Sequence, residues 1–165
     1  MRSPRQILFA FYWNGCVRDI IPIYPLYAVM FIDHGVSPLG LSVLLALWAT
    51  VAFVFEIPSG AWADRFSRKW LIVIGAVIKG AAFIAWWLRP DFFGFALGFF
   101  FWGFGSTLRS GAWEALLHDT LKSWGREQEF GRRYGQATGL ATFGVVIADL
   151  AGGLLIVFGY DLVLL

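Results

Sequence analysis

Long apolar segments separated by short polar stretches run through the 165 residues of this chain. A helix that crosses a membrane needs about 20 consecutive, mainly apolar residues. Five such segments follow one another, and a further apolar run, 162–165, begins after the fifth. The pattern predicts an all-α membrane protein with five transmembrane helices and the start of a sixth, at residues 7–31, 41–60, 70–88, 92–118 and 137–158.

Helix breakers and charged residues separate these segments. Gly35 and Pro38 follow the first segment, and Pro90 lies between the third and the fourth. The longest polar stretch, 122–134, precedes the fifth segment. Because a chain rarely ends within the first turn of a new helix, we expect the sequence to be a piece of a longer protein.

Prolines and glycines inside the segments predict how the helices bend and pack. Pro22 and Pro25 are expected to kink the first helix. Two Gly-x-x-x-Gly pairs have the spacing at which membrane helices approach closely: Gly94 with Gly98, and Gly135 with Gly139.

The composition also fits a lipid environment. Hydrophobic residues make up 59% of the chain and charged residues 15%, compared with roughly half and a quarter in soluble domains. The net charge of +2 is too small to favour nucleic acid as a partner. The single cysteine, Cys16, cannot form an internal disulfide, and no spacing typical of metal ligands is present. Asn14, Arg18 and Asp19 interrupt the first apolar run, which favours a retained helix over a cleaved signal peptide.

Lysines and arginines gather in alternate connections. One group lies at the N-terminus and in the second and fourth connections: Arg2, Arg5, Arg65, Arg68, Lys69, Lys122, Arg126, Arg132 and Arg133. The opposite connections carry only Arg89. Because cytoplasmic loops are enriched in basic residues, we expect a cytoplasmic N-terminus.

The turn between the second and third segments, residues 60–69, reads Gly-Ala-Trp-Ala-Asp-Arg-Phe-Ser-Arg-Lys. This signature turn resembles the cytoplasmic loop of the major facilitator superfamily, Gly-x-x-x-Asp-Arg-x-Gly-Arg-Lys, with Ser67 in place of a glycine. Residues 56–60 and 110–119 also resemble bacterial members, so the resemblance implies a location in the bacterial plasma (inner) membrane. The family has twelve spans in two six-span halves. The resemblance therefore implies that residues 1–165 are part of the N-terminal six-helix bundle, and that the C-terminal half of the same protein is missing here.

The signature turn predicts a conformational gate. Asp64 and Arg68 are four residues apart and can pair on a helical turn, and the glycine is expected to let two helices approach closely. The resemblance adds Asp119, so that the three charges would latch the outward-open state; alternatively, the basic residues only set the topology. The candidate gate residues are Gly60, Asp64, Arg65, Arg68, Lys69, Asp119, Glu56 and Glu114.

Charged residues also lie inside the predicted spans: Arg18, Asp19, Glu56, Lys79, Arg109, Glu114 and Asp149. A charge at the bilayer centre costs at least ~2.5–3.5 kcal/mol, so it usually faces a cavity or a partner. The resemblance implies that the first and fourth spans line a central cavity. The substrate or coupling candidates are therefore Asp19, Arg18 and Arg109, with Trp102 and Trp113 on the same stripe as Arg109, and Asp149 in the fifth span. Alternatively, Asp19 and Arg109 form a structural pair, and Lys79 is expected to have a structural partner.

These features together predict secondary active transport of a small organic solute by alternating access. We expect proton-coupled efflux by an antiporter, with the proton as coupling ion and no other cofactor. An uptake carrier of the same family, or a membrane scaffold or assembly subunit that transports nothing, are the alternatives. An enzyme is not expected, because the chain has neither a nucleotide-binding Gly-Lys-Ser/Thr loop nor a nucleophile elbow.

Overall fold

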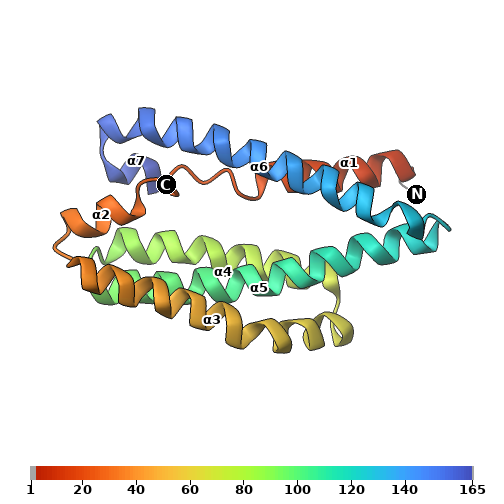
Figure 1. The fold of residues 1–165 in the computed structure, drawn as a ribbon, viewed down its shortest axis with the longest axis horizontal. Coiled ribbons are helices and arrows are strands. Elements are labelled where there is room, and N and C mark those ends of the chain that lie inside the picture. The colour runs from red at the N-terminus through yellow and green to blue at the C-terminus, as the bar shows by residue number, and fades with distance from the viewer. Residues whose placement is uncertain (1–2, 165) are drawn as a thin grey trace. The chain divides into compact units, whose positions relative to one another are not determined.

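The computed structural model describes residues 3–164, and the helices account for nearly all of them (Figure 1). Arg2, which belongs to the predicted basic N-terminus, and Leu165, which ends the last apolar run, lie outside the described residues. The helices are α1 (Pro4–Val17), α2 (Tyr27–Asp33), α3 (Pro38–Arg65), α4 (Arg68–Leu88), α5 (Phe92–Ser123), α6 (Phe130–Leu155) and α7 (Tyr160–Leu164), with 3₁₀ turns η1 (Glu127–Glu129) and η2 (Ile156–Phe158).

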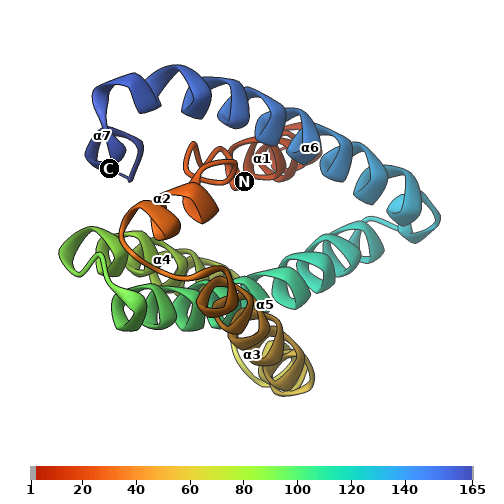
Figure 2. The same ribbon diagram turned by 60° about the vertical axis from the view of Figure 1, so that its left-hand side comes forward.

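The chain divides into two compact units, which are described separately. The α1–α6 unit comprises Met1–Leu26 and Leu117–Val163, so it holds α1, the end of α5, α6 and most of α7. The α2–α5 unit comprises Tyr27–Leu116, with α2, α3, α4 and most of α5. Within the first unit α1 runs alongside α6, and within the second α4 runs alongside α5 (Figures 1 and 2).

The prediction of one continuous helix over 7–31 is wrong. α1 ends at Val17, the chain then turns through 18–26, and α2 begins at Tyr27. Pro22 and Pro25 lie in this break. A proline cannot donate a backbone hydrogen bond and disfavours helix in the residue before it. The two prolines were expected to kink the helix, and the structure shows a complete interruption.

The other predicted segments correspond to α3, α4, α5 and α6, but most of these helices are longer than predicted. α3 begins at Pro38, where the Ser37 side chain caps it by accepting from the Gly40 amide at 3.1 Å. α5 continues to Ser123 and α6 begins at Phe130, so much of the predicted polar connection is helical. Backbone hydrogen bonds do not require apolar side chains, so a helix can extend beyond the apolar segment that predicts it. Among the described residues, three helical segments are long and apolar enough to cross a membrane. They are α3 (Pro38–Arg65), α4 (Arg68–Leu88) and the continuous stretch of η1, α6 and η2 (Glu127–Phe158).

Aromatic rings fill the interior of the α2–α5 unit. Phe31 of α2 stacks on Phe95 of α5 with ring centroids 3.8 Å apart, and Trp86 of α4 packs edge-on against Phe31 at 4.9 Å. Trp86 is fully buried, and its indole donates to the Phe95 carbonyl at 3.2 Å. The predicted close contact at Gly98 is confirmed, because a Cβ there would overlap the Trp86 ring.

Small residues fill the contact between α1 and α6. The buried residues of α6 are Ala137, Ala141, Gly144, Ala148 and Gly152. A Cβ on Gly144 would overlap the carbonyl oxygen of Cys16, and one on Gly152 would overlap that of Pro22. The predicted close contact at Gly135 and Gly139 is wrong, since a Cβ at either position would meet no atom within 4 Å. The small residues that pack against α1 therefore lie on a different face of α6 from Gly135 and Gly139.

Candidate functional site

Arg68 organises the signature turn between α3 and α4. Its Nε donates to the Ala63 carbonyl at 3.2 Å and its Nη1 donates to the Ala115 carbonyl of α5 at 3.1 Å. Nη2 lies 3.6 Å from Oδ1 of Asp64, which confirms the predicted pairing of these two residues. The Asp64 side chain is 77% exposed, so the ion pair itself contributes little to stability. The hydrogen bonds of Arg68 instead tie the end of α3 and the start of α4 to α5.

The remaining residues of the signature turn have fewer contacts. Arg65 and Lys69 are exposed, and Ser67 occupies the N-cap of α4 without a side-chain hydrogen bond. The expected close helix contact at Gly60 is wrong, because a Cβ there would meet no heavy atom within 4 Å. Close packing occurs further along α4, where a Cβ on Gly75 would lie 2.6 Å from the Gly105 carbonyl oxygen of α5.

The carboxylates proposed to complete the gate lie on α3 and α5. Asp119 belongs to the α1–α6 unit, where its Oδ1 lies 3.7 Å from Nδ1 of His118. Nε2 of the same histidine lies 3.2 Å from Oε1 of Glu127. Glu56 and Glu114 belong to the α2–α5 unit, and both side chains are exposed. The participation of Asp119 in a latch with Asp64 and Arg68 stays a prediction.

Arg18 and Asp19 lie at the point where the first predicted span breaks. Arg18 is the C-cap residue of α1, so the two side chains are not arranged by a continuous helix. Nε of Arg18 lies 3.1 Å from Oδ2 of Asp19, and the Tyr24 hydroxyl donates to Oδ1 of Asp19 at 3.4 Å. Both charged side chains are about three-quarters buried, with 22% and 24% exposure. Asp19 therefore has a cation and a hydroxyl donor within its own segment.

The candidates on α5 lie near α4 and the aromatic interior. A Cβ on Gly75 of α4 would be 3.1 Å from Cγ of Arg109, so the aliphatic stem of this arginine packs against α4. Trp113 is buried. Trp102 contacts the rings of Tyr27, Trp48, Phe83, Trp86 and Phe99, with centroids 5.7–6.2 Å apart.

Asp149 differs from the other charged candidates in its hydrogen bonding. Its Oδ1 is buried and, among the described residues, has no hydrogen-bond partner. Oδ1 of Asn14 on α1 has the same property, and both residues belong to the α1–α6 unit. A buried polar atom without a partner costs free energy. A hydrogen-bond donor on a bound solute would satisfy the Asp149 oxygen.

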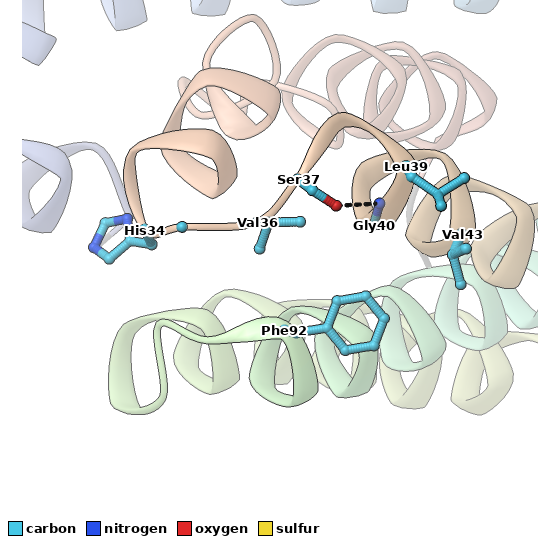
Figure 3. A pocket seen from close by; sticks show the side chains of 8 residues that line it. His34, Val36, Ser37, Leu39, Gly40, Val43 and Phe92 are labelled. Atoms are coloured by element: carbon cyan, nitrogen blue, oxygen red, sulfur yellow. Dashed lines mark hydrogen bonds between the residues drawn. The ribbon is translucent and has the colours of Figure 1, made fainter.

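A cavity of about 430 Å³ lies in the α2–α5 unit, where the segment after α2 meets the start of α5 (Figure 3). Its walls include Leu39, Val43 and Phe92. Ser37 Oγ already accepts from the Gly40 amide, and Nδ1 of His34 lies 2.7 Å from the Met30 carbonyl oxygen. The polar groups near this cavity therefore serve to end α2 and begin α3, and none of the predicted site residues lines it.

A family model described as Major Facilitator Superfamily matches residues 7–165. The chain belongs to the major facilitator superfamily. The resemblance drawn from the signature turn is thereby confirmed. Membership of this transporter family, together with the long apolar helices, identifies the chain as an integral membrane protein.

Two curated relatives from this superfamily are similar to most of the chain. Both are named multidrug resistance protein MdtH, one from Enterobacter sp. (strain 638) and one from Salmonella paratyphi C (strain RKS4594). Each is 28% identical over 148 residues, which is 89% of this chain. The chain spans only 36% of the length of these relatives.

Two polar groupings in this superfamily member have partners that the sequence did not specify. Lys79 is only 6% exposed, and its ammonium lies 6.0 Å from the centroid of the Trp102 ring, which agrees with the structural partner expected for it. A cation over an indole face is stabilised by the ring quadrupole. No spacing rule connects Lys79 of α4 with Trp102 of α5, so only the packing of the two helices reveals this contact.

The second grouping surrounds Glu129, in η1 ahead of the apolar part of α6. Oε2 of Glu129 accepts from Arg126 at 2.8 Å and from Arg133 at 2.9 Å, and Arg133 also donates to the Tyr12 hydroxyl at 3.0 Å. Hydrogen bonds from Arg126 and then Arg133 lower the pKa of Glu129 from 4.5 to about 2. In the sequence, these pairs could have been predicted from the spacing of three and four residues between Glu129 and the two arginines.

Proposed function

We propose that this chain supplies the first five spans, and the start of the sixth, of a transporter that exports a small organic solute in exchange for protons. Membership of the superfamily is the observation that carries the proposal. The name of the two relatives, multidrug resistance protein, supports export of organic molecules. The charged side chains within apolar segments support a polar pathway, because such charges are costly unless they have a function or a partner.

The proposed topology has five crossings, with the N-terminus and both basic loops in the cytoplasm of a bacterial cell and the protein in its inner membrane. The broken stretch of α1 and α2 forms the first crossing, and α3, α4, α5 and α6 form the others. Cysteine labelling in intact cells tests the orientation, after Cys16→Ser has removed the natural thiol. We expect Ser67→Cys to be protected from a membrane-impermeant reagent and Ser37→Cys to be labelled, and the reverse would contradict the orientation.

For the coupling step we propose Asp149 as the residue that takes and releases the proton. Its buried Oδ1 supports this role, because no hydrogen-bond donor among the described residues occupies that oxygen. Asp19 is the next candidate, but its carboxylate already has Arg18 at 3.1 Å and the Tyr24 hydroxyl at 3.4 Å. Arg18 in the α1–α6 unit, and Arg109, Trp102 and Trp113 in the α2–α5 unit, are the other proposed substrate residues, because charged and aromatic side chains suit amphipathic solutes.

For the conformational step we propose that Asp64, Arg68 and Asp119 form a charge latch, supported at the cytoplasmic side by Arg65, Lys69, Glu56 and Glu114. The bond from Arg68 to the Ala115 carbonyl supports this role, because it already connects the signature turn to α5. Asp119 lies four residues further along the same helix. Alternating access then requires this group to form in one state and separate in the other.

Transport by the complete protein in sealed lipid vesicles tests the function. We expect an imposed pH gradient to move an amphipathic fluorescent dye against its own gradient, in the direction opposite to the protons. Dye movement in the same direction as the protons would indicate an uptake carrier instead. A folded protein that moves no dye under a pH gradient would contradict proton-coupled export of such molecules.

A further inference from the structure

A cavity of about 510 Å³ opens in the α1–α6 unit, at the end where α1 begins and the turn before α6 lies. We call it the arginine pocket; its lining residues are Arg5, Leu8, Phe9, Tyr12, Arg126 and Arg133. The volume is within the usual range of ligand pockets, about 300–1,000 Å³. None of the residues assigned to transport or to the latch lines this pocket.

The polar side of the arginine pocket carries excess positive charge. Three guanidinium groups line it, and Glu129 is the carboxylate that pairs with two of them. Glu129 and the Tyr12 hydroxyl hold Arg133 in place, and that side chain is only 19% exposed. Arg5 is exposed and, among the described residues, has no ion pair. The pocket therefore presents oriented donors and at least one uncompensated charge, which suits an anion such as a phosphate group.

The other side of the pocket is apolar and continues along α1. Leu8 is buried, whereas Phe9 is 66% exposed and Trp13, one turn further, is 60% exposed. The rings of Phe9 and Trp13 stack with centroids 6.5 Å apart. Arg5, Phe9 and Trp13 are spaced four residues apart, so they follow one face of the helix. A ligand held by Arg5 would therefore lie beside an aromatic surface that continues along the apolar part of α1.

We propose that the arginine pocket binds an anionic phospholipid, with the phosphate on Arg5, Arg126 and Arg133 and an acyl chain along Phe9 and Trp13. The arginine side of the pocket matches the anionic headgroup of such a lipid, and the aromatic side matches its acyl chain. The pocket also lies where basic residues adjoin the apolar segments of α1 and α6. Basic pockets between membrane helices are recognised sites for anionic headgroups. A free phosphate ion shares the headgroup chemistry but would make no use of the exposed aromatic rings.

The test uses the complete protein, purified in mild detergent and titrated with phosphatidylglycerol or with the zwitterionic lipid phosphatidylcholine. Native mass spectrometry counts the lipids that stay bound. We expect selective retention of phosphatidylglycerol, which Arg5→Gln reduces by about fivefold, the usual effect of one basic residue on attraction to anionic lipid. Arg132→Gln removes an exposed charge that does not line the pocket and should leave retention unchanged. Equal retention of the two lipids, or equal losses in the two variants, would overturn the proposal.

Two further measurements separate the lipid from other occupants. Inorganic phosphate should displace phosphatidylglycerol poorly, and Phe9→Ala should weaken retention while Arg5 is intact. Displacement by phosphate at equal concentration would show a free-anion site and overturn the lipid proposal. If another part of the complete protein fills the pocket, Arg5→Gln should lower the melting temperature without any lipid selectivity in the wild type, which also overturns it.

Discussion

The two units of this chain are packed by opposite means. In the α2–α5 unit, large rings such as Phe31, Trp86 and Phe95 fill the interior, and the Trp86 indole is hydrogen-bonded. In the α1–α6 unit, glycines and alanines of α6 bring its backbone against α1, and side-chain oxygens of Asn14 and Asp149 are buried without partners among the described residues. The buried indole nitrogen of Trp48 also lacks a hydrogen-bond partner in the α2–α5 unit, but only the α1–α6 unit buries a carboxylate oxygen in this way among the described residues.

This difference indicates where each unit contributes to function. Membrane helices associate without a hydrophobic driving force between them, so they depend on van der Waals packing and hydrogen bonds. A ring-filled interior provides many such contacts and suits a fixed support. A seam of small residues needs few side-chain rearrangements when one helix shifts along another. We therefore propose that proton coupling takes place in the α1–α6 unit, whereas the ring-filled interior of the α2–α5 unit keeps its own helices fixed.

Removal of a central ring should produce the largest effect. Trp86 contacts several other rings and is fully buried, so Trp86→Ala leaves a cavity and should cost about 3–5 kcal/mol of stability. The measurement is thermal unfolding of the complete protein in detergent. Trp87→Ala is the matched control, because Trp87 is 43% exposed and should change stability much less. Similar losses for both variants would contradict the ring-filled support.

A single methyl group in the small-residue seam should have the next largest effect. In Gly144→Ala the new Cβ would overlap the Cys16 carbonyl oxygen, so the helices must separate, at a cost of about 1–3 kcal/mol. Gly139→Ala is the control on the same helix, since its Cβ meets no atom within 4 Å and alanine favours helix. Unfolding in detergent should distinguish the two, and equal stability would show that the seam is not close-packed.

Neutralisation of Asp64 tests the proposed latch. Asp64→Asn should reduce transport about tenfold, because a charge-assisted contact of roughly 1.4 kcal/mol is lost from one conformational state. Stability should change by less than about 1 kcal/mol, since an exposed ion pair contributes little. Asp161→Asn removes another exposed carboxylate, outside the turn, and should leave transport unchanged. Normal transport by Asp64→Asn together with Arg68→Ala would exclude the latch.

The Glu129 network should give the smallest effect, with a defined pH dependence. Folding lowers the pKa of Glu129 from 4.5 to about 2, so its contribution to stability is present above pH 4.5 and is lost as the pH falls towards 2. The melting temperatures of wild type and Glu129→Gln should therefore converge on acidification. A difference in melting temperature between wild type and Glu129→Gln that stays constant on acidification would contradict the network.

Much of the fold could be predicted because long apolar segments in the sequence identify membrane helices. The apolar segments 41–60, 70–88, 92–118 and 137–158 all lie within helices of the structure. The continuous first helix could not be excluded, because its apolar run is long enough and prolines produce either kinks or breaks. Whether Gly139 or Gly144 faces a neighbouring helix depends on the rotation of α6, which glycine spacing alone does not specify.

Less of the candidate site was accessible from the sequence. The Asp64–Arg68 pair follows from spacing on one turn, and the structure contains it. Two contacts join different helices: the hydrogen bond from Arg68 to Ala115, and the contact of Lys79 with the Trp102 ring. Neither could be predicted, because the packing of the helices sets which residues face each other. The Arg18–Asp19 pair lies at the break after α1, which the apolar pattern did not predict.

The most direct test of proton coupling through Asp149 compares two transport modes in the same vesicles. Asp149→Asn in the complete protein should abolish dye transport driven by a pH gradient but retain exchange of dye across the membrane without a gradient. Asp19→Asn, which disrupts the pair with Arg18, should lower folded yield and reduce both modes together. Gradient-driven transport that persists in Asp149→Asn and fails selectively in Asp19→Asn would contradict the account and assign coupling to Asp19.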